Sequence, residues 1–416
     1  MARCFQSILR RGPESAAVVA HYRSLGIGET ELVRILIDSR EFLDGQRRRL
    51  ALRDLGTQAG GAWPVRERRR PRVLLFGAFG NGNLGDAAQA GAVASLLRRM
   101  LPGGLDVAAS SWECAAPFAG RRVVPLARDA LLRPDWLDGG QPGSARLVVI
   151  GGGGLFGTPH FPLHEIGWVD WFVGRGVPFA LLGIGGSAAA LNTAPASAAY
   201  RRLIEAACFV SGRDAETLLA LRAIRPDAAW FPDPVLAAGL LARLPESRRA
   251  RPIDVLLIPR FPNNAQDVAA NRGALAFRAA AAEAGLRVVM TALEPMLDRQ
   301  VLRDEAVADV AGWDELLALC VQARCVTSAR YHGVIAGLAS GCVVHGLVQP
   351  KIGALLAELG LDDWFCAEGW PAAGVPLDAG SQAAFRVRAD AGLAGLGTRL
   401  AGAMASTGAA LAAAMA

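Results

Sequence analysis

The amino-acid sequence lacks several features that would place it in a specialised class of protein. None of its seven cysteines belongs to a CxxC pair, so the chain fits neither a disulfide framework nor a zinc module, and we expect buried or neutral thiols. The longest apolar stretch, residues 176–191, contains Pro178, Ser187 and several glycines and does not match a membrane span. The start, MARCFQSILRRGPES, has no long apolar region before a cleavage site. These absences predict a soluble cytoplasmic protein.

Lysine is almost absent, because Lys351 stands alone beside 43 arginines, a ratio that mostly reflects a coding bias. The formal charge of +6 is unevenly distributed: residues 1–72 hold 15 arginines and 8 acidic residues, so the remainder carries −1. Two interpretations of this basic segment remain open. It is either a solvated helical face with a basic linker, or a surface for anionic lipid headgroups or nucleic acid. We expect peripheral contact with an anionic membrane at its inner face, and no nucleic-acid partner.

The length of 416 residues and the hydrophobic content of 52% predict two domains with large cores. Helical periodicity over residues 20–55, followed by GTQAGGAWPV, indicates an added helical segment and linker at 1–70. Short apolar runs then alternate with helical stretches, the pattern of parallel sheets covered on both faces. The expected strands are RVLLF (72–76), RLVVI (146–150), PFALL (178–182), ACFV (207–210), IDVLLI (253–258), LRVVM (286–290), RCVT (324–327) and CVVHGL (342–347).

The arginine-rich stretch LPESRRARP at 244–252 separates these strands into two series. We therefore expect an α/β fold with a first Rossmann-like domain at 71–245 and a second at 246–379. Alanine-rich residues 380–416 are expected to form closing helices. No repeat of solenoid type is found.

The turns that follow the strands share a composition. RVLLF is followed by GAFGNGNLGD, RLVVI by GGGGLFG, PFALL by GIGGS, ACFV by SGRD, and RCVT by SARYHG. Ligands of open parallel sheets bind beyond the carboxyl ends of the strands, where glycines let backbone N–H groups approach an anion. Each turn alone could be simple turn geometry, but together they predict one binding crevice.

The ordered set GNGNLGD, VVIGGGGLF, LLGIGGS, VSGRDAETLLALRAI, FPDPVL and SARYHGVIAGLASG, followed by Lys351, resembles the polysaccharide pyruvyl transferase family. The resemblance runs from about Arg72 to about Trp364. It implies two Rossmann-like domains in a glycosyltransferase-B-like arrangement. It also implies transfer of a pyruvyl ketal from phosphoenolpyruvate to a saccharide or lipid-linked saccharide in cell-surface or exopolysaccharide biosynthesis.

This sequence departs from the family's usual pattern at three places. The first loop reads GDAAQ, whereas an acidic residue usually follows GD in the family, and this difference would alter contacts with the acceptor. GIGGS lacks the proline that usually follows GIG, and RYH replaces Arg-Leu-His, and both of these changes look conservative. No cofactor is expected, because phosphoenolpyruvate is itself the donor substrate.

Phosphoenolpyruvate presents a phosphate and a carboxylate, and arginine forks satisfy such oxyanions. The expected donor-binding residues are Arg213, Arg330, Lys351, Gly153, Gly154 and Gly185. His332, on the same turn as Arg330, is the expected proton-transfer group; its alternative role is a helix-capping or core histidine. Asn83 and Asp86 are expected to contact the acceptor, with Asp86 also a catalytic candidate, and helix capping is their alternative.

Five other residues are expected to have structural roles or no catalytic role. Asp214 is expected to start its helix and align Arg213, and Asp233, between two prolines, to be a turn residue. His160 and His164 lack a third well-placed ligand, so no metal site is expected. His345 lies in an apolar strand and is expected to be structural.

Two functional alternatives remain. The same architecture serves glycosyltransferases that use nucleotide-activated sugars, because fold does not decide function. A non-catalytic family member could instead act through the basic N-terminal segment. The acceptor sugar, the polymer and the oligomeric state are not determined by the sequence.

Overall fold

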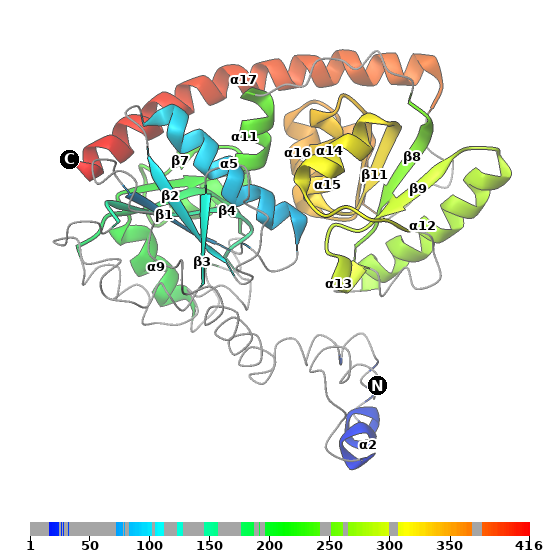
Figure 1. Cartoon of the computed structure of the whole chain (residues 1–416), viewed down its shortest axis with the longest axis horizontal. Helices are drawn as coiled ribbons and strands as arrows, with labels where there is room; N and C mark the ends of the chain where they lie inside the picture. Colours follow the sequence, from blue (N-terminus) through cyan, green and yellow to red (C-terminus); the bar gives the residue numbers. More distant parts are fainter. Residues whose placement is uncertain are drawn as a thin grey trace.

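Two α/β domains lie side by side, and one long C-terminal helix runs along both (Figure 1). The computed structural model describes residues 16–24, 26, 28, 32, 72–77, 79, 83–101, 105–111, 123–127, 145–156, 176–186, 191, 196–241, 251–260, 265–298, 307–367 and 377–416. Helix α2 (Ala16–Ser24) is the helix described within residues 1–70. Most of that segment lies outside the described residues.

The first domain contains a seven-stranded parallel sheet in the order β3-β2-β1-β4-β5-β6-β7. Its strands are β1 (Arg72–Phe76), β2 (Asp106–Ser111), β3 (Val123–Ala127), β4 (Leu147–Gly153), β5 (Phe179–Ile184), β6 (Phe209–Gly212) and β7 (Ala229–Trp230). Its helices are α5 (Leu84–Met100), α9 (Ala196–Ala206), α10 (Ala215–Arg222) and α11 (Pro234–Leu241).

Both faces of this sheet are apolar, as the continuous hydrophobic strands require. Leu74 and Phe76 of β1 face a core that contains residues of α9 and α10. Val73 and Leu75 face the opposite core, which α5, α11 and the C-terminal helix cover. This alternation follows from the two-residue period of a strand.

The second domain contains a six-stranded parallel sheet in the order β10-β9-β8-β11-β12-β13. Its strands are β8 (Ile253–Ile258), β9 (Val288–Thr291), β10 (Val307–Ala308), β11 (Ala323–Ser328), β12 (Val343–Leu347) and β13 (Phe365–Cys366). Its helical segments are α12 (Ala265–Glu283), α13 (Pro295–Asp298), α14 (Trp313–Val321), α15 (Tyr331–Ala339), α16 (Pro350–Glu358) and the 3-10 turn η3 (Asp362–Trp364).

The strand orders place a topological switch point in each sheet. In the first, β1 pairs with β2 on one side and β4 on the other, and in the second, β8 lies between β9 and β11. Crossovers leave in opposite directions from these points, and the loops there part to make room for ligands. Helix α15 follows β11 at the second switch point, and α5 follows β1 at the first.

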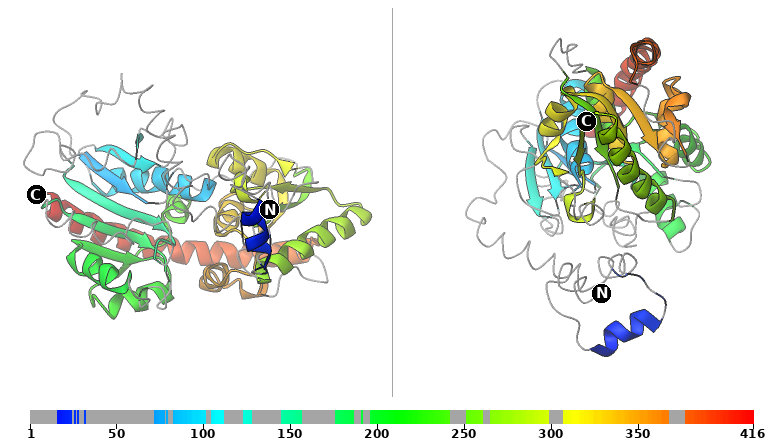
Figure 2. Two further views of the ribbon diagram at one scale, coloured as in Figure 1. Left: turned by 90° about the horizontal axis from the view of Figure 1, so that it is seen from below. Right: turned by 90° about the vertical axis from the view of Figure 1, so that its right-hand side faces the viewer.

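Helix α17 (Ala379–Met415) joins the two domains along one side of the molecule (Figure 2). Its N-terminal half packs on the second core through Phe385, Ala389 and Leu396. Its C-terminal half packs on the first core through Leu400 and Leu411. The expectation of several closing helices was wrong, because residues 379–415 form one helix of 37 residues.

The predicted fold class is confirmed: two Rossmann-like domains in a glycosyltransferase-B-like arrangement. All eight predicted strands are present, with ends shifted by up to three residues. Strands β2, β3, β7, β10 and β13 were not predicted. The predicted domain boundary at 245 lies outside the described residues. Within the described part of the chain, no helix combines the length and hydrophobicity needed to cross a membrane.

Candidate active site

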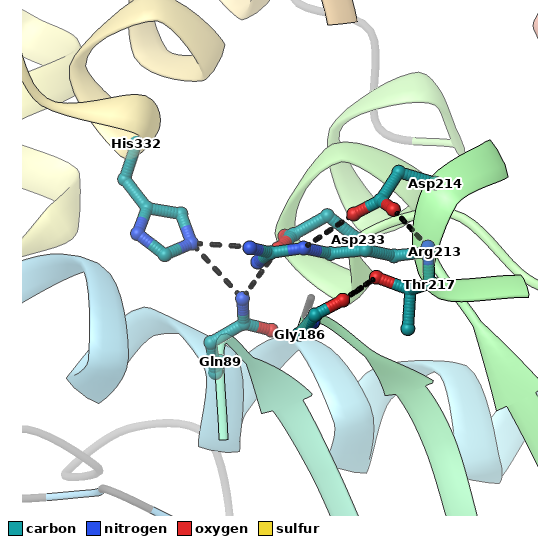
Figure 3. A network of polar contacts seen from close by, with 7 residues as sticks. All are labelled: Gln89, Gly186, Arg213, Asp214, Thr217, Asp233 and His332. Atoms are coloured by element: carbon teal, nitrogen blue, oxygen red, sulfur yellow. Dashed lines mark hydrogen bonds and ion pairs between the residues drawn. The ribbon is translucent and has the colours of Figure 1, made fainter. Parts of the chain in front are cut away.

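The candidate site lies where the first turns of α5 and α15 meet the strand ends of the first sheet. Leu84 N–H at the start of α5 donates to Leu293 O in the second domain over 2.8 Å, which fixes the two domains against each other. Seven residues of the site form one polar network, with Gln89, Arg213 and Asp233 from the first domain and His332 from the second (Figure 3).

Arg213 follows β6 directly and is 6% exposed. Its Nη1 donates to Asp233 Oδ2 over 3.1 Å, and its guanidinium carbon lies 4.7 Å from the centroid of the Tyr331 ring. Its Nε is buried without a hydrogen-bond partner among the described residues. Any Cβ at Gly185 would collide with this guanidinium, so glycine there lets the backbone approach the arginine. A buried, incompletely satisfied arginine edge is a suitable ligand for an oxyanion.

Asp233 is the buried carboxylate that connects this network. Its Oδ2 accepts from Gln89 Nε2 over 2.8 Å, and its Oδ1 accepts from Val235 N–H over 3.0 Å. Burial opposes ionisation, but attraction to His332 in its protonated form and to Arg213, with the Gln89 hydrogen bond, holds the pKa of Asp233 below its usual range. The sequence predicted that Asp233 is a turn residue, and this role accounts only for Oδ1, which binds Val235 N–H. Its Oδ2 instead binds Gln89 and Arg213 in the site.

His332 lies in the first turn of α15 and is 9% exposed. Its Nε2 lies 2.9 Å from Gln89 Nε2 and 3.7 Å from Asp233 Oδ2. The ionised Asp233 fixes the Gln89 amide, since the flipped amide would place an oxygen against a carboxylate. Nε2 of His332 therefore accepts the second Gln89 N–H when the ring is neutral. Its other nitrogen, Nδ1, lies against Gly85, where any Cβ would collide with the ring.

Arg330, the residue before α15, pairs with two carboxylates. Its Nη1 lies 2.8 Å from Glu294 Oε2, its Nε donates to Asp298 Oδ2 over 3.2 Å, and its Nη2 pairs with Asp298 Oδ1. These two carboxylates raise the pKa of Arg330 in spite of its burial. Donor binding by Arg330 stays a prediction, and an incoming anion would share the guanidinium with these partners.

Lys351 lies in the first turn of α16, with its Nζ 5.8 Å from the centroid of the Tyr331 ring. The pKa of its ammonium group is lowered to about 7, first by desolvation and then by the charges of Arg213, Arg260 and Arg330, although Asp86 opposes this. Lys351 was predicted to face the same site as the arginines, and the presence of Arg213 and Arg330 among its charged neighbours is consistent with this position.

Asn83 caps α5, since its Oδ1 accepts from Gly85 N–H over 2.9 Å. Asp86 lies in the first turn of that helix, and a Cβ at Gly153 would lie 3.7 Å from its Oδ1. A Cβ at Gly154 would lie 3.6 Å from Arg213 Nη2. The three predicted glycines thus surround the side chains of Asp86 and Arg213. Contact of Asn83 and Asp86 with an acceptor stays a prediction.

Asp214 acts as predicted, because it caps α10 by accepting from Thr217 N–H over 2.8 Å and lies 3.6 Å from Arg213 Nε. Gln89, Glu294, Asp298 and Tyr331 were not predicted. Glu294 follows β9 by three residues, so the strand-end rule that selected Arg213 could have selected it. Gln89 lies inside a helix and has no comparable signal.

Among the described residues, no group of histidine, cysteine and acidic side chains is arranged to hold a metal ion. His160 and His164 lie outside the described part. Five cysteines are described and all are free. Burial raises the pKa of the Cys325 thiol to about 12 and that of Cys342 to about 11, so these thiols are neutral. His345 is 6% exposed within β12, and burial lowers its pKa to about 4.

Solved structures share this architecture at low sequence identity. The chain matches MnaA of S. aureus, solved with UDP, at a TM-score of 0.50, 8% identity, 72% of this chain and 84% of that chain. It matches the UDP-GlcNAc 2-epimerase of Methanocaldococcus jannaschii, in complex with UDP-GlcNAc and UDP, at a TM-score of 0.50 and 10% identity, over 72% of this chain and 89% of that chain. E. coli heptosyltransferase WaaC with ADP matches at a TM-score of 0.37 and 13% identity, over 67% of this chain and 88% of that chain. The first two show the fold alone.

A comparison with curated proteins finds no match. The comparison with family models matches residues 83–349 to polysaccharide pyruvyl transferase. This range covers more than half of the chain and contains α5, Arg213, Asp233 and the Arg330–His332 turn. The chain therefore belongs to the polysaccharide pyruvyl transferase family.

Proposed function

We propose that this protein transfers the pyruvyl group of phosphoenolpyruvate to two hydroxyls of a saccharide or lipid-linked saccharide, forming a ketal and releasing phosphate. One observation carries the proposal. Cations and a histidine from both domains converge at Tyr331, with Arg213 4.7 Å and Lys351 5.8 Å from its ring centroid and the His332 ring 5.5 Å away. No further cofactor is expected.

The donor has one phosphate and one carboxylate, which suit a cationic site. The Nε of Arg213 is buried without a hydrogen-bond partner within the described structure, with Asp214 3.6 Å away, so an oxyanion there would gain a charge-assisted hydrogen bond. Lys351 adds a second cation from the other domain. The N-terminus of α15 contributes positive potential beside His332.

The reaction needs a proton at the methylene carbon of the donor. His332 is the proposed source, because histidine is a common proton-transfer group in enzymes and its ring is held by Gln89. Asp86, in the adjoining turn of α5, is proposed to contact the acceptor hydroxyls together with Asn83. Asn83 also caps this helix, since its Oδ1 accepts from Gly85 N–H.

Phosphate release from phosphoenolpyruvate, measured with a panel of saccharide acceptors, tests this function. A thermal-shift series with phosphoenolpyruvate, UDP-GlcNAc and UDP provides a binding test, because a specific ligand stabilises the folded state in proportion to occupancy. Stabilisation by phosphoenolpyruvate and acceptor-dependent phosphate release are expected. The unsubstituted protein and the Arg213→Met variant form the matched pair for donor binding.

Transfer from a nucleotide-activated sugar is the second candidate. The fold is shared with proteins solved with UDP or UDP-GlcNAc, which is the observation that favours it. Stabilisation by UDP-GlcNAc, without phosphate release from phosphoenolpyruvate, would move the assignment to this alternative. Stabilisation by none of these ligands would favour a non-catalytic member.

A further inference from the structure

Glu294 lies at the domain boundary, opposite the first turn of α5. Leu293, the preceding residue, accepts the hydrogen bond from Leu84 N–H over 2.8 Å. Gly85, the next residue of that turn, packs against the His332 ring. Glu294 and His332 therefore approach the same turn of α5, one from the end of β9 and the other from the start of α15.

The proposed reaction releases two hydroxyl protons and delivers one proton to carbon. The C=C electron pair of the donor forms a new C–H bond with one delivered proton. Each of two sugar oxygens bonds to the neighbouring carbon and loses its proton, and phosphate departs with the electron pair of its C–O bond. One proton is delivered and two are released. His332 can give one and regain one, so the other hydroxyl proton goes to the departing phosphate, either directly or through a second group that accepts it first.

Glu294 and Asp298 bind the same guanidinium but differ in access. Glu294 Oε2 lies 2.8 Å from Arg330 Nη1, and its side chain is 18% exposed. Asp298 also pairs with Arg330, but its side chain is 0% exposed, and it accepts from Glu294 N–H over 2.9 Å. Asp298 thus has no face for a substrate. Glu294 is held in place by Arg330, and part of its side chain remains accessible to a substrate.

The charged groups around Glu294 suit a proton acceptor. Burial raises its pKa, Asp298 and Asp86 raise it further, and Arg330 opposes this. A carboxylate of raised basicity accepts a hydroxyl proton more readily than an ordinary surface carboxylate. Asp86 lies on the α5 turn where the acceptor is proposed to bind.

We propose that Glu294 is a second catalytic residue, the base that accepts the proton of an attacking saccharide hydroxyl while Arg330 holds it in position. This inference rests on the proposed function. It assigns Arg330 the additional role of orienting this base through the ion pair between Arg330 and Glu294.

The matched variants are Glu294→Gln and Asp298→Asn, since both neutralise a partner of Arg330 and only the first removes an accessible base. Steady-state phosphate release would be measured from pH 5 to 9 with phosphoenolpyruvate and the active acceptor. For Glu294→Gln we expect kcat to fall by about 10² to 10⁴, with the donor KM nearly unchanged and the acidic limb of the kcat profile lost. For Asp298→Asn we expect a raised donor KM and a preserved acidic limb.

The thermal shift induced by phosphoenolpyruvate shows whether each variant is folded and binds the donor. Equal effects of both variants on kcat and on the pH profile would show that Glu294 acts only through Arg330, and would overturn the inference. Near-full turnover of folded Glu294→Gln would also overturn it. If the wild-type protein releases no phosphate from phosphoenolpyruvate, the proposed function fails and this role fails with it.

Discussion

The imidazole of His332 touches both domains, which makes it the most informative side chain to replace. In His332→Asn an amide replaces the imidazole, so a hydrogen-bonding side chain is kept and the proposed proton-transfer group is lost. We expect kcat to fall by about 10² to 10⁴, with donor binding retained, because positioned acid–base catalysis has this magnitude. Phosphate release and a melting curve provide the measurement. Near-full turnover of the folded variant would eliminate His332 as the proton-transfer residue.

Lys351 predicts a pH dependence of donor affinity. With a pKa of about 7, its ammonium group is charged below this pH and neutral above it. The donor KM of the wild-type protein should therefore rise as the pH increases from 6 to 8.5, and bound anion would partly counteract this by favouring the charged form.

Lys351→Arg and Lys351→Met are the matched variants for this prediction. Arginine remains charged throughout the range and should abolish the rise, while methionine should give a high KM at every pH. Titration of the donor itself is common to all three proteins and cancels in the comparison. The same pH dependence in Lys351→Met as in the wild type would contradict the role of this lysine.

His345 predicts how stability responds to acid. Its folded-state pKa is about 4, below the ordinary value near 6.5, so the unfolded chain binds the proton first as the pH falls. Its contribution to stability is present above about pH 6.5 and is lost between 6.5 and 4. His345→Leu should lose less stability over this window. Urea midpoints at pH 7 and 4.5 test this, and equal losses in both proteins would refute it.

Residues that follow strands were predictable, and residues that depend on interdomain docking were not. Arg213 and His332 were found because a parallel sheet collects its strand ends at one edge. The partners of Arg330 were missed, since nothing in TSARYHG shows that Glu294 and Asp298 lie opposite. Gln89 likewise acquires its role only when α15 is brought against α5.

Glycines within α17 differ sharply in what surrounds them. A Cβ at Gly392 would lie 2.5 Å from Leu359 O, and one at Gly408 would lie 2.9 Å from Met100 O, both backbone atoms. A Cβ at Gly402 would meet nothing within 4 Å. Alanine favours a helix over glycine by about 1 kcal/mol, so only the open position should benefit.

We therefore expect Gly402→Ala to raise the melting temperature, and Gly392→Ala and Gly408→Ala to lower it. Calorimetry of the three variants is the measurement, with Gly402→Ala as the control within the same helix. A stabilised Gly408→Ala would show that α17 does not pack closely on the first domain.

Element prediction succeeded where apolar runs were long and failed where they were short. β1 and β8, each with a continuous aliphatic run, were predicted with their observed bounds. β2 has the weakly patterned sequence DVAASS, and β3 contains Pro125 and lies at the sheet edge, where proline is tolerated. Residues 380–416 were predicted as several helices from their alanine-rich composition, and they form one helix that packs on two cores.

The N-terminal segment is proposed to bind anionic membrane surfaces, because residues 1–72 hold 15 arginines and 8 acidic residues. Each basic residue near such a surface contributes about 1 kcal/mol, so the clusters at 47–49 and 66–70 should dominate. Co-sedimentation with anionic liposomes should be stronger for the full chain than for a version starting near Pro71, and should weaken with salt. Equal sedimentation of both at low salt would dismiss this proposal.

The path of α17 also sets the order in which the molecule can mature on the ribosome. Leu400 and Leu411 are fully buried in the apolar core of the first domain, although the whole second domain, from β8 to β13, is synthesised before them. During translation the outer face of the first sheet therefore remains partly uncovered until residue 411 has emerged. The second domain receives Phe385, Ala389 and Leu396 earlier. The domain made first is thus completed last, and a chain that ends prematurely between Leu396 and Leu400 leaves its defect in the N-terminal half.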